Sequence, residues 1–129
     1  MTTYNTNLAA EFYVLSMLHR LGADAALTLG NKKAVDIIVT NEGRTITIDV
    51  KGLAGPYDWP ADNIQVFQDT QHFYILVSFE HKITDPLSVP SAWIIPANEL
   101  FQYIRKYKTR TVISRAEVKA KGQEFLHAW

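Results

Sequence analysis

The first apolar pattern in the chain has the spacing of an amphipathic helix. Residues 8–21 repeat large apolar side chains every three or four positions, which places them on one side of a helix. The repeating set is Leu8, Phe12, Leu15 and Leu18, widened by Val14, Met17 and Leu21. Thr6 or Asn7 is expected to cap the start of this helix, and Gly22 suits the position just past its end.

Shorter apolar runs follow, with the alternation and the β-branched residues of strands. The expected strands cover residues 23–29, 34–40, 45–51, 73–79 and 92–95. The run 73–79 is almost wholly apolar, as expected for a strand that is covered on both faces. A helix is expected over 98–106, and a shorter one over 114–121, where Ser114 and Glu117 can form a capping box.

This order of elements predicts an α/β fold. The strands between residues 34 and 51 form a hairpin, which makes them antiparallel, and a long apolar strand joins the sheet later in the chain. We therefore expect a central mixed β-sheet flanked by helices. At 129 residues the chain fits one domain, and no repeat or linker divides it.

The composition excludes several classes of protein. The chain has no cysteine, which rules out disulfides and thiolate zinc sites and agrees with a reducing compartment. Residues 1–18 lack the basic start and the cleavage site of a secretory signal. No apolar run approaches the ~20 residues that span a bilayer. We therefore expect a soluble, cytoplasmic protein without a membrane partner.

The charges are unevenly distributed although they cancel overall. From Arg105 onward there are seven basic and two acidic residues, a net charge of +5, and residues 1–104 carry −5. Such a segment occurs in proteins that bind polyanions, but also as an ordinary solvated helix face. The candidate nucleic-acid-binding residues are Arg105, Lys106, Lys108 and Arg110.

Three charged residues lie inside the strands of the hairpin. Side chains alternate across a strand, so Asp49 and Lys51 share one face. A two-residue turn at residues 42–43, or a four-residue turn over residues 41–44, pairs Asp36 directly with Asp49. Their Cβ atoms would then lie about 5 Å apart.

The paired carboxylates of Asp36 and Asp49 repel unless a positive charge lies between them. Mg²⁺ takes oxygen ligands and is commonly held by one or two carboxylates with waters and a substrate phosphate. Lys51, beside Asp49, adds a charge that can orient a phosphoryl group. The alternative is a surface cluster with a simple Asp49–Lys51 ion pair.

Glu11 is a carboxylate within the apolar stripe of the first helix. Apolar residues lie three positions before it and three, four and seven positions after it. A buried carboxylate is costly without a partner. Lys51, or a cation at the two aspartates, would supply one if the helix packs on the hairpin. The alternative is a glutamate that snorkels at the edge of the stripe.

The order of these residues resembles a known nuclease pattern. Glu11 on a helix, then Asp36, then twelve residues, then Asp49-Val50-Lys51 is similar to the PD-(D/E)XK nuclease superfamily. The likeness covers roughly residues 8–52. It is strongest to small stand-alone members such as archaeal Holliday junction resolvases and the PD-(D/E)XK-type group I intron endonucleases.

The resemblance implies the restriction-endonuclease-like fold for residues 1–129. This fold is a three-layer core in which a central mixed sheet lies between helices. The chain departs from the pattern at Val35, where the namesake motif has proline. Many members lack that proline.

The resemblance further implies a metal-dependent endodeoxyribonuclease. Asp36 and Asp49 would bind a catalytic Mg²⁺ or Mn²⁺, helped by the Val50 carbonyl. Lys51 would position the attacking water, and Glu11 would complete the metal site. DNA is then the expected partner, and a homodimer is allowed, because small members often pair to cut both strands. The alternative is the same fold kept as an inactive module that binds nucleic acid or a protein.

Several further side chains have ordinary interpretations. Tyr57 and Trp59, in a loop rich in glycine and proline, could stack on a base, but are expected to pack the loop onto the core. Gln65 and Gln68 are expected to be surface residues. The histidines at positions 19, 72, 81 and 127 have no metal-ligand spacing and are assigned no role.

Overall fold

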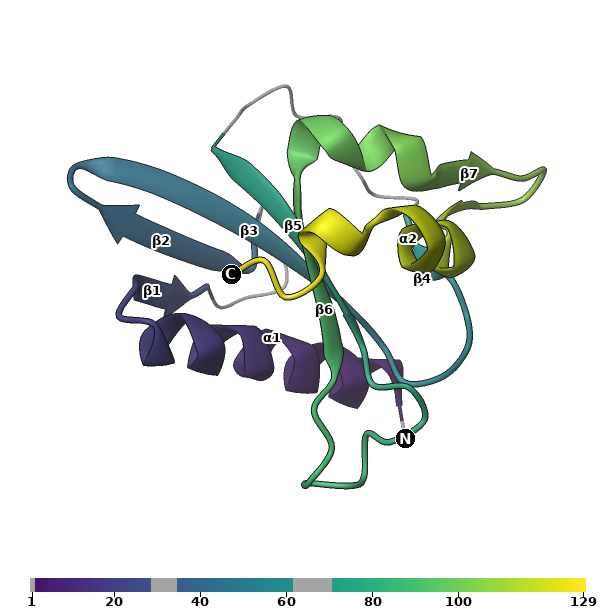
Figure 1. The fold of residues 1–129 in the computed structure, drawn as a ribbon, viewed down its shortest axis with the longest axis horizontal. Coiled ribbons are helices and arrows are strands. Elements are labelled where there is room, and N and C mark those ends of the chain that lie inside the picture. The colour runs from purple at the N-terminus through teal and green to yellow at the C-terminus, as the bar shows by residue number, and fades with distance from the viewer. Residues whose placement is uncertain (1, 29–34, 62–70) are drawn as a thin grey trace.

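A five-stranded sheet forms the centre of the computed structural model, which describes residues 2–28, 35–61 and 71–129 (Figure 1). Within these residues the strand order is β1-β2-β3-β5-β6. The bounds are Asp24–Leu27 (β1), Ile37–Asn41 (β2), Arg44–Leu53 (β3), His72–Ser78 (β5) and Ser91–Pro96 (β6). β3 and β5 are parallel and the other neighbours antiparallel, so the sheet is mixed, as predicted.

Helix α1 (Thr3–Arg20) packs on one face of this sheet. It starts earlier than predicted, because the side chain of Thr2 accepts a hydrogen bond from the Asn5 N–H at 3.1 Å and caps the helix there. The predicted cap at Thr6 or Asn7 is therefore wrong. The first turn is polar apart from Tyr4 and carries no apolar period, which is why the pattern did not include it.

Three residues with a left-handed backbone lie at the two turns that the sequence predicts on either side of the first strands. Gly22 has a φ of 83° and follows the end of α1, as predicted. Glu42 and Gly43, with φ of 50° and 80°, form the two-residue turn between β2 and β3. The two strands then pair in the predicted register, from the turn to Ile37 opposite Ile48.

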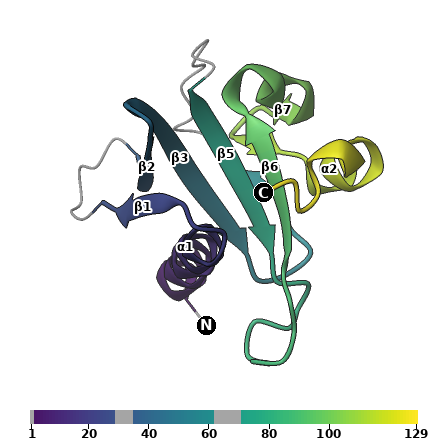
Figure 2. The ribbon, with the colours of Figure 1, turned by 60° about the vertical axis from the view of Figure 1, so that its left-hand side comes forward.

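Apolar side chains cover both faces of the central sheet. Helix α1 lies on one side of the sheet and the later elements of the chain lie on the other (Figure 2). The core under α1 includes Ala10, Val14, Ile37, Val39, Ile48, Val50, Ile75 and Val77. The core on the other face includes Leu53, Trp59, Tyr74, Leu76, Trp93, Ile95, Leu100 and Tyr103. β5 contributes to both cores, which confirms that this strand is covered on both faces. The sheet is thus the middle one of three layers.

Short elements make up the layer opposite α1. A small sheet of order β4-β8-β7 combines Trp59–Pro60 (β4), Thr111–Ile113 (β8) and Ile104–Lys106 (β7). Beside it lie the 3-10 helices η1 (Ala97–Tyr103) and η2 (Gln123–Phe125) and helix α2 (Arg115–Lys121).

Of the two helices predicted after residue 97, the second is present and the first is present only in part. Ser114 caps α2 as expected, because its hydroxyl accepts a hydrogen bond from the Glu117 N–H at 3.3 Å. The other half of the predicted capping box is wrong, since the Ser114 N–H donates to the Tyr103 carbonyl and the Glu117 carboxylate pairs with Arg105 and Lys121. The helix predicted over 98–106 is wrong in its last third. There the β-branched Ile104 begins a strand and pairs with Ile113. No helix in the described ranges has both the length and the apolar character needed to cross a membrane.

Candidate active site

A cleft of about 840 Å³ opens beside β3. β3 has ten residues and β2 only five, so in the described structure β3 continues past Ile48 without a partner strand on that edge. The first half of α1 and the loop after β3 supply other walls. The lining includes five candidate residues from the sequence, namely Glu11, Asp36, Val50, Lys51 and Arg110.

Glu11 reaches the cleft from α1 and is only 6% exposed. Its neighbours Ala10 and Val14 are fully buried in the core under α1. Gly52 lets the helix approach the strand closely, because an added Cβ would lie 2.8 Å from the Ala10 Cβ and 3.0 Å from the Thr6 carbonyl oxygen. This burial confirms that Glu11 belongs to the packing face of the helix.

Asp36 lies directly before β2 and is held to β3 by hydrogen bonds. Its Oδ2 accepts a hydrogen bond from the Val50 N–H at 2.8 Å, and its own N–H donates to the Ile48 carbonyl at 3.0 Å. The Thr28 N–H donates to the Asp36 carbonyl at 2.9 Å. The regular pairing of β2 with β3 ends at Ile37 and Ile48. The predicted direct pairing of Asp36 with Asp49, which would be the next pair, is therefore not part of the sheet.

Asp49 points away from α1, because its neighbours Ile48 and Val50 face that helix. It is partly buried, and its Oδ2 lies 3.3 Å from His72 Nε2. Burial raises the pKa of Asp49, and the nearby carboxylate of Asp36 raises it further; His72 and Lys51 act in the opposite direction. The two aspartates are therefore close enough to interact, although the described cleft lining includes only Asp36.

His72 is a buried neighbour of Asp49 that the sequence did not reveal. The parallel pairing of β3 with β5 sets His72 opposite Thr47 and Tyr74 opposite Asp49, on one face. His72 Nδ1 lies 2.6 Å from Thr47 Oγ1, and its ring packs edge-on against Tyr74. Burial and the charge of Asp49 raise the pKa of Tyr74 to about 12. The local sequence does not indicate that His72 lies beside Asp49, because only the register of β3 with β5 brings the two residues together.

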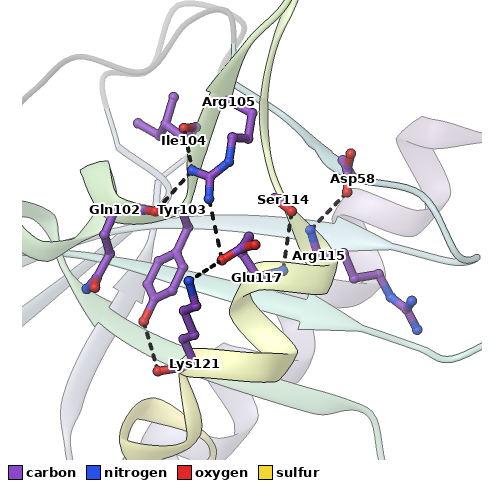
Figure 3. Close-up of polar contacts among 9 residues, drawn as sticks. All are labelled: Asp58, Gln102, Tyr103, Ile104, Arg105, Ser114, Arg115, Glu117 and Lys121. Carbon is purple, nitrogen blue, oxygen red and sulfur yellow. Dashed lines mark hydrogen bonds and ion pairs between the residues drawn. The ribbon is translucent and has the colours of Figure 1, made fainter.

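Ion pairs occupy much of the basic segment after residue 104 (Figure 3). Glu117 Oε2 lies 3.4 Å from Arg105 Nη2 and 3.1 Å from Lys121 Nζ. Glu80 forms an ion pair with Arg115, and its Oε1 lies 3.2 Å from Lys119 Nζ. A large part of the positive charge is therefore compensated within the fold.

Three of the four candidate nucleic-acid-binding residues remain exposed around the turn between β7 and β8. Lys106, Lys108 and Arg110 form no ion pair within residues 2–28, 35–61 and 71–129. Arg105 and Lys106 lie in strand β7, so the alternative of a basic helix face is wrong for them. Arg110 also lines the cleft, where it joins Lys51.

The two aromatic residues of the loop after β3 differ in their surroundings. Trp59 is fully buried between the sheets, as predicted. Tyr57 is 72% exposed and lines the cleft, so the prediction that it packs onto the core is wrong. Gln65 and Gln68 lie outside the described residues.

Of the comparisons with known proteins, only the one with solved structures found a similar protein. No protein family and no curated protein matches the sequence. A solved structure, that of the bacterial homing endonuclease I-Ssp6803I, is similar with a TM-score of 0.59. This chain therefore shares the fold of that protein. The two proteins are 14% identical over 99% of this chain and 88% of the other, so the likeness establishes the fold alone.

Proposed function

We propose that this chain is a metal-dependent endonuclease that hydrolyses phosphodiester bonds in DNA. The observation that carries the proposal is the meeting of Glu11, Asp36 and Lys51 in one cleft, from three different segments. The fold shared with a bacterial homing endonuclease supports the same class of reaction. The order of the residues along the chain, which resembles the PD-(D/E)XK pattern, supports it independently of the fold.

The oxygen donors near the cleft suit a hard divalent cation such as Mg²⁺ or Mn²⁺. Asp36 and Asp49 repel each other, which contributes to the raised pKa of Asp49, and a cation between them would relieve the repulsion. The Val50 carbonyl is a further donor. It points to the edge that β2 leaves open, because the N–H and C=O of one residue share an edge and Asp36 holds this N–H.

The residues present would form a site with two carboxylates rather than three. In the described part of the chain, no three His, Cys, Asp or Glu side chains lie close enough together to hold a metal ion. Magnesium sites commonly use one or two carboxylates and take their remaining ligands from water and substrate phosphate. Asp36, Asp49 and the Val50 carbonyl would therefore hold the cation, with Glu11 adding negative charge from α1.

The side chains around the cleft have distinct roles in hydrolysis. The cation, when bound, would polarise the scissile phosphate and lower the pKa of the attacking water. Lys51, on the cleft lining, would stabilise the negative charge that develops on the phosphate oxygens. Asp36 is oriented by the Val50 N–H, and Asp49 by His72. Arg110, which also lines the cleft, would contact a neighbouring phosphate.

Cleavage of DNA tests the proposal directly. Supercoiled, single-stranded and branched DNA are incubated with the protein in Mg²⁺ or Mn²⁺. Asp49→Asn and Lys51→Ala are expected to slow cleavage about 100-fold or more. Asp24→Asn and Lys82→Ala remove exposed charges outside the cleft lining and serve as matched controls. Absence of cleavage by the wild type, or full activity of Asp49→Asn, would contradict the proposal.

A second candidate is an inactive module of the same fold that binds nucleic acid. The contact of Asp49 with His72, rather than with the cleft, favours it. This candidate predicts salt-sensitive DNA binding without cation binding in calorimetry. Replacing Lys106, Lys108 and Arg110 by alanine would then abolish the binding.

Two further expectations accompany the nuclease proposal. We propose that the protein acts in the cytoplasm, in agreement with the absence of cysteine from the sequence. We also propose that two copies pair to cut both strands. Sedimentation of the protein with and without duplex DNA tests the pairing.

A further inference from the structure

Two exposed tyrosine rings lie on the lining of the cleft. Tyr57 is 72% exposed and Tyr4 is 70% exposed. Trp59, only two residues after Tyr57, is fully buried. The same loop thus buries one aromatic ring in the core and leaves the other on the cleft, next to the candidate catalytic residues.

The loop that carries Tyr57 is fixed by neighbouring elements. The His81 N–H donates a hydrogen bond to the Ala54 carbonyl at 2.9 Å. Asp58 accepts a hydrogen bond from the Arg115 N–H at 2.9 Å, which ties the loop to the start of α2 (Figure 3). Hydrogen bonds on both sides of Tyr57, to the Ala54 carbonyl and the Asp58 side chain, therefore tie the loop to neighbouring elements.

Local structure places both tyrosine residues beside the cleft. Gly55 lies against the Tyr57 ring, where an added Cβ would be 3.3 Å from the ring atom Cε2. Tyr4 belongs to the first turn of α1, which Thr2 caps. Tyrosine has few rotatable bonds, so its ring loses little conformational entropy when a ligand stacks on it.

Positive charges complete the same surface. Lys51 and Arg110 line the cleft together with the two tyrosines. Aromatic faces beside cations form the platforms on which proteins bind single-stranded nucleic acid, one base per ring. In a paired duplex the faces of the bases are covered by their neighbours, so only an unpaired base can stack on such a ring.

We propose that the cleft binds DNA at an unpaired nucleotide, with its base stacked on Tyr57, a neighbouring base on Tyr4, and the phosphate between them near Arg110. This inference rests on the proposed nuclease function and specifies its substrate class. The enzyme cleaves next to single-stranded DNA, such as a bulge, flap or fork, and cleaves a perfect duplex poorly.

Binding without catalysis tests this inference separately from the nuclease function. Fluorescence anisotropy in EDTA compares three DNAs of equal length, namely a perfect duplex, the same duplex with a three-nucleotide bulge, and a single strand. We expect the bulged and single-stranded DNAs to bind more tightly than the duplex. Tyr57→Ala is expected to weaken binding to both by roughly five-fold or more. Tyr57→Phe keeps the ring and should restore the affinity.

Phe101→Ala is the matched control, because Phe101 is an exposed aromatic residue on η1 outside the cleft lining. It should leave all three affinities unchanged. Equal affinity for duplex and bulged DNA, or undiminished binding by Tyr57→Ala with correct folding by circular dichroism, would overturn the inference. Tight binding to bulged DNA without cleavage in Mg²⁺ or Mn²⁺ would support the stacking site and overturn the nuclease function instead.

Discussion

The carboxylate of Asp36 accepts a hydrogen bond from the backbone N–H of Val50, with 2.8 Å between Oδ2 and N. The bond forms just before the first residue of β2, where β3 continues without a paired strand on that edge, so a side chain takes the place of a strand carbonyl. It fixes one acid of the candidate site to the strand that carries Asp49 and Lys51. The same contact therefore contributes to stability and to the geometry of the site.

Loss of this bond is expected to destabilise the fold. Asp36→Ala should lower the free energy of unfolding by about 1–3 kcal/mol, because the Val50 N–H loses a charged acceptor. Asp36→Asn keeps an oxygen acceptor and should cost less. Urea denaturation measures both variants, with Asp24→Ala, at an exposed position of β1, as the control. An Asp36→Ala protein as stable as the wild type would show that the bond contributes nothing.

Gly52→Ala is expected to separate α1 from β3. Its Cβ would lie 2.8 Å from the Ala10 Cβ, a distance that forces a shift of the backbone. We expect a loss of about 1–3 kcal/mol, measured by thermal unfolding. Adding Ala10→Gly removes the closest atom, so the double variant should lose less than the two single losses combined. Simple additivity would show that the two residues are not in contact.

His72→Leu is expected to raise the pKa of Asp49. In the folded protein the His72 ring, 3.3 Å from Asp49 Oδ2, opposes the increase caused by burial and by Asp36. Without the ring, protonation of Asp49 becomes easier. Carboxyl ¹³C NMR titration measures the change, with His19→Leu, at an exposed position of α1, as the control. A lowered pKa in His72→Leu would contradict the placement of His72.

Glu80 is expected to make the free energy of unfolding depend on pH. Burial acts to raise its pKa, but the contacts with Lys119 and Arg115 lower it overall, below the ordinary value of 4.5. A lowered pKa in the folded state contributes stability that is present above the unfolded value and is lost as pH falls through the folded value. Glu80→Gln should therefore cost more stability at pH 7 than at pH 3, measured by urea denaturation. An equal loss at both pH values would contradict the ion pairs.

Local patterns predicted the hairpin and most of α1. The turn at Glu42 and Gly43 selects positive φ, and its length fixes the register of β2 with β3. Gly22 marks the end of α1 for the same conformational reason. The first turn of α1 was not predicted, because the cap at Thr2 determines where the helix starts and no apolar period marks that position.

Contacts between segments far apart in the sequence could not be predicted from the sequence alone. His72 meets Asp49 only because β5 pairs parallel to β3, and no local spacing specifies that register. Tyr57 and Trp59 have similar apolar character in the sequence, and only the finished core shows which of them has a buried site. Ion pairs such as Arg105 with Glu117 likewise join different elements.

Manganese in a crystal of the wild-type protein tests the central claim most directly. We expect an anomalous difference peak between the carboxylates of Asp36 and Asp49, within reach of the Val50 carbonyl, and its loss in Asp49→Asn. Mn²⁺ can replace Mg²⁺ at oxygen-rich sites. A peak elsewhere, or no peak at a Mn²⁺ concentration that supports binding to other magnesium enzymes, would contradict a metal-dependent site at this cleft.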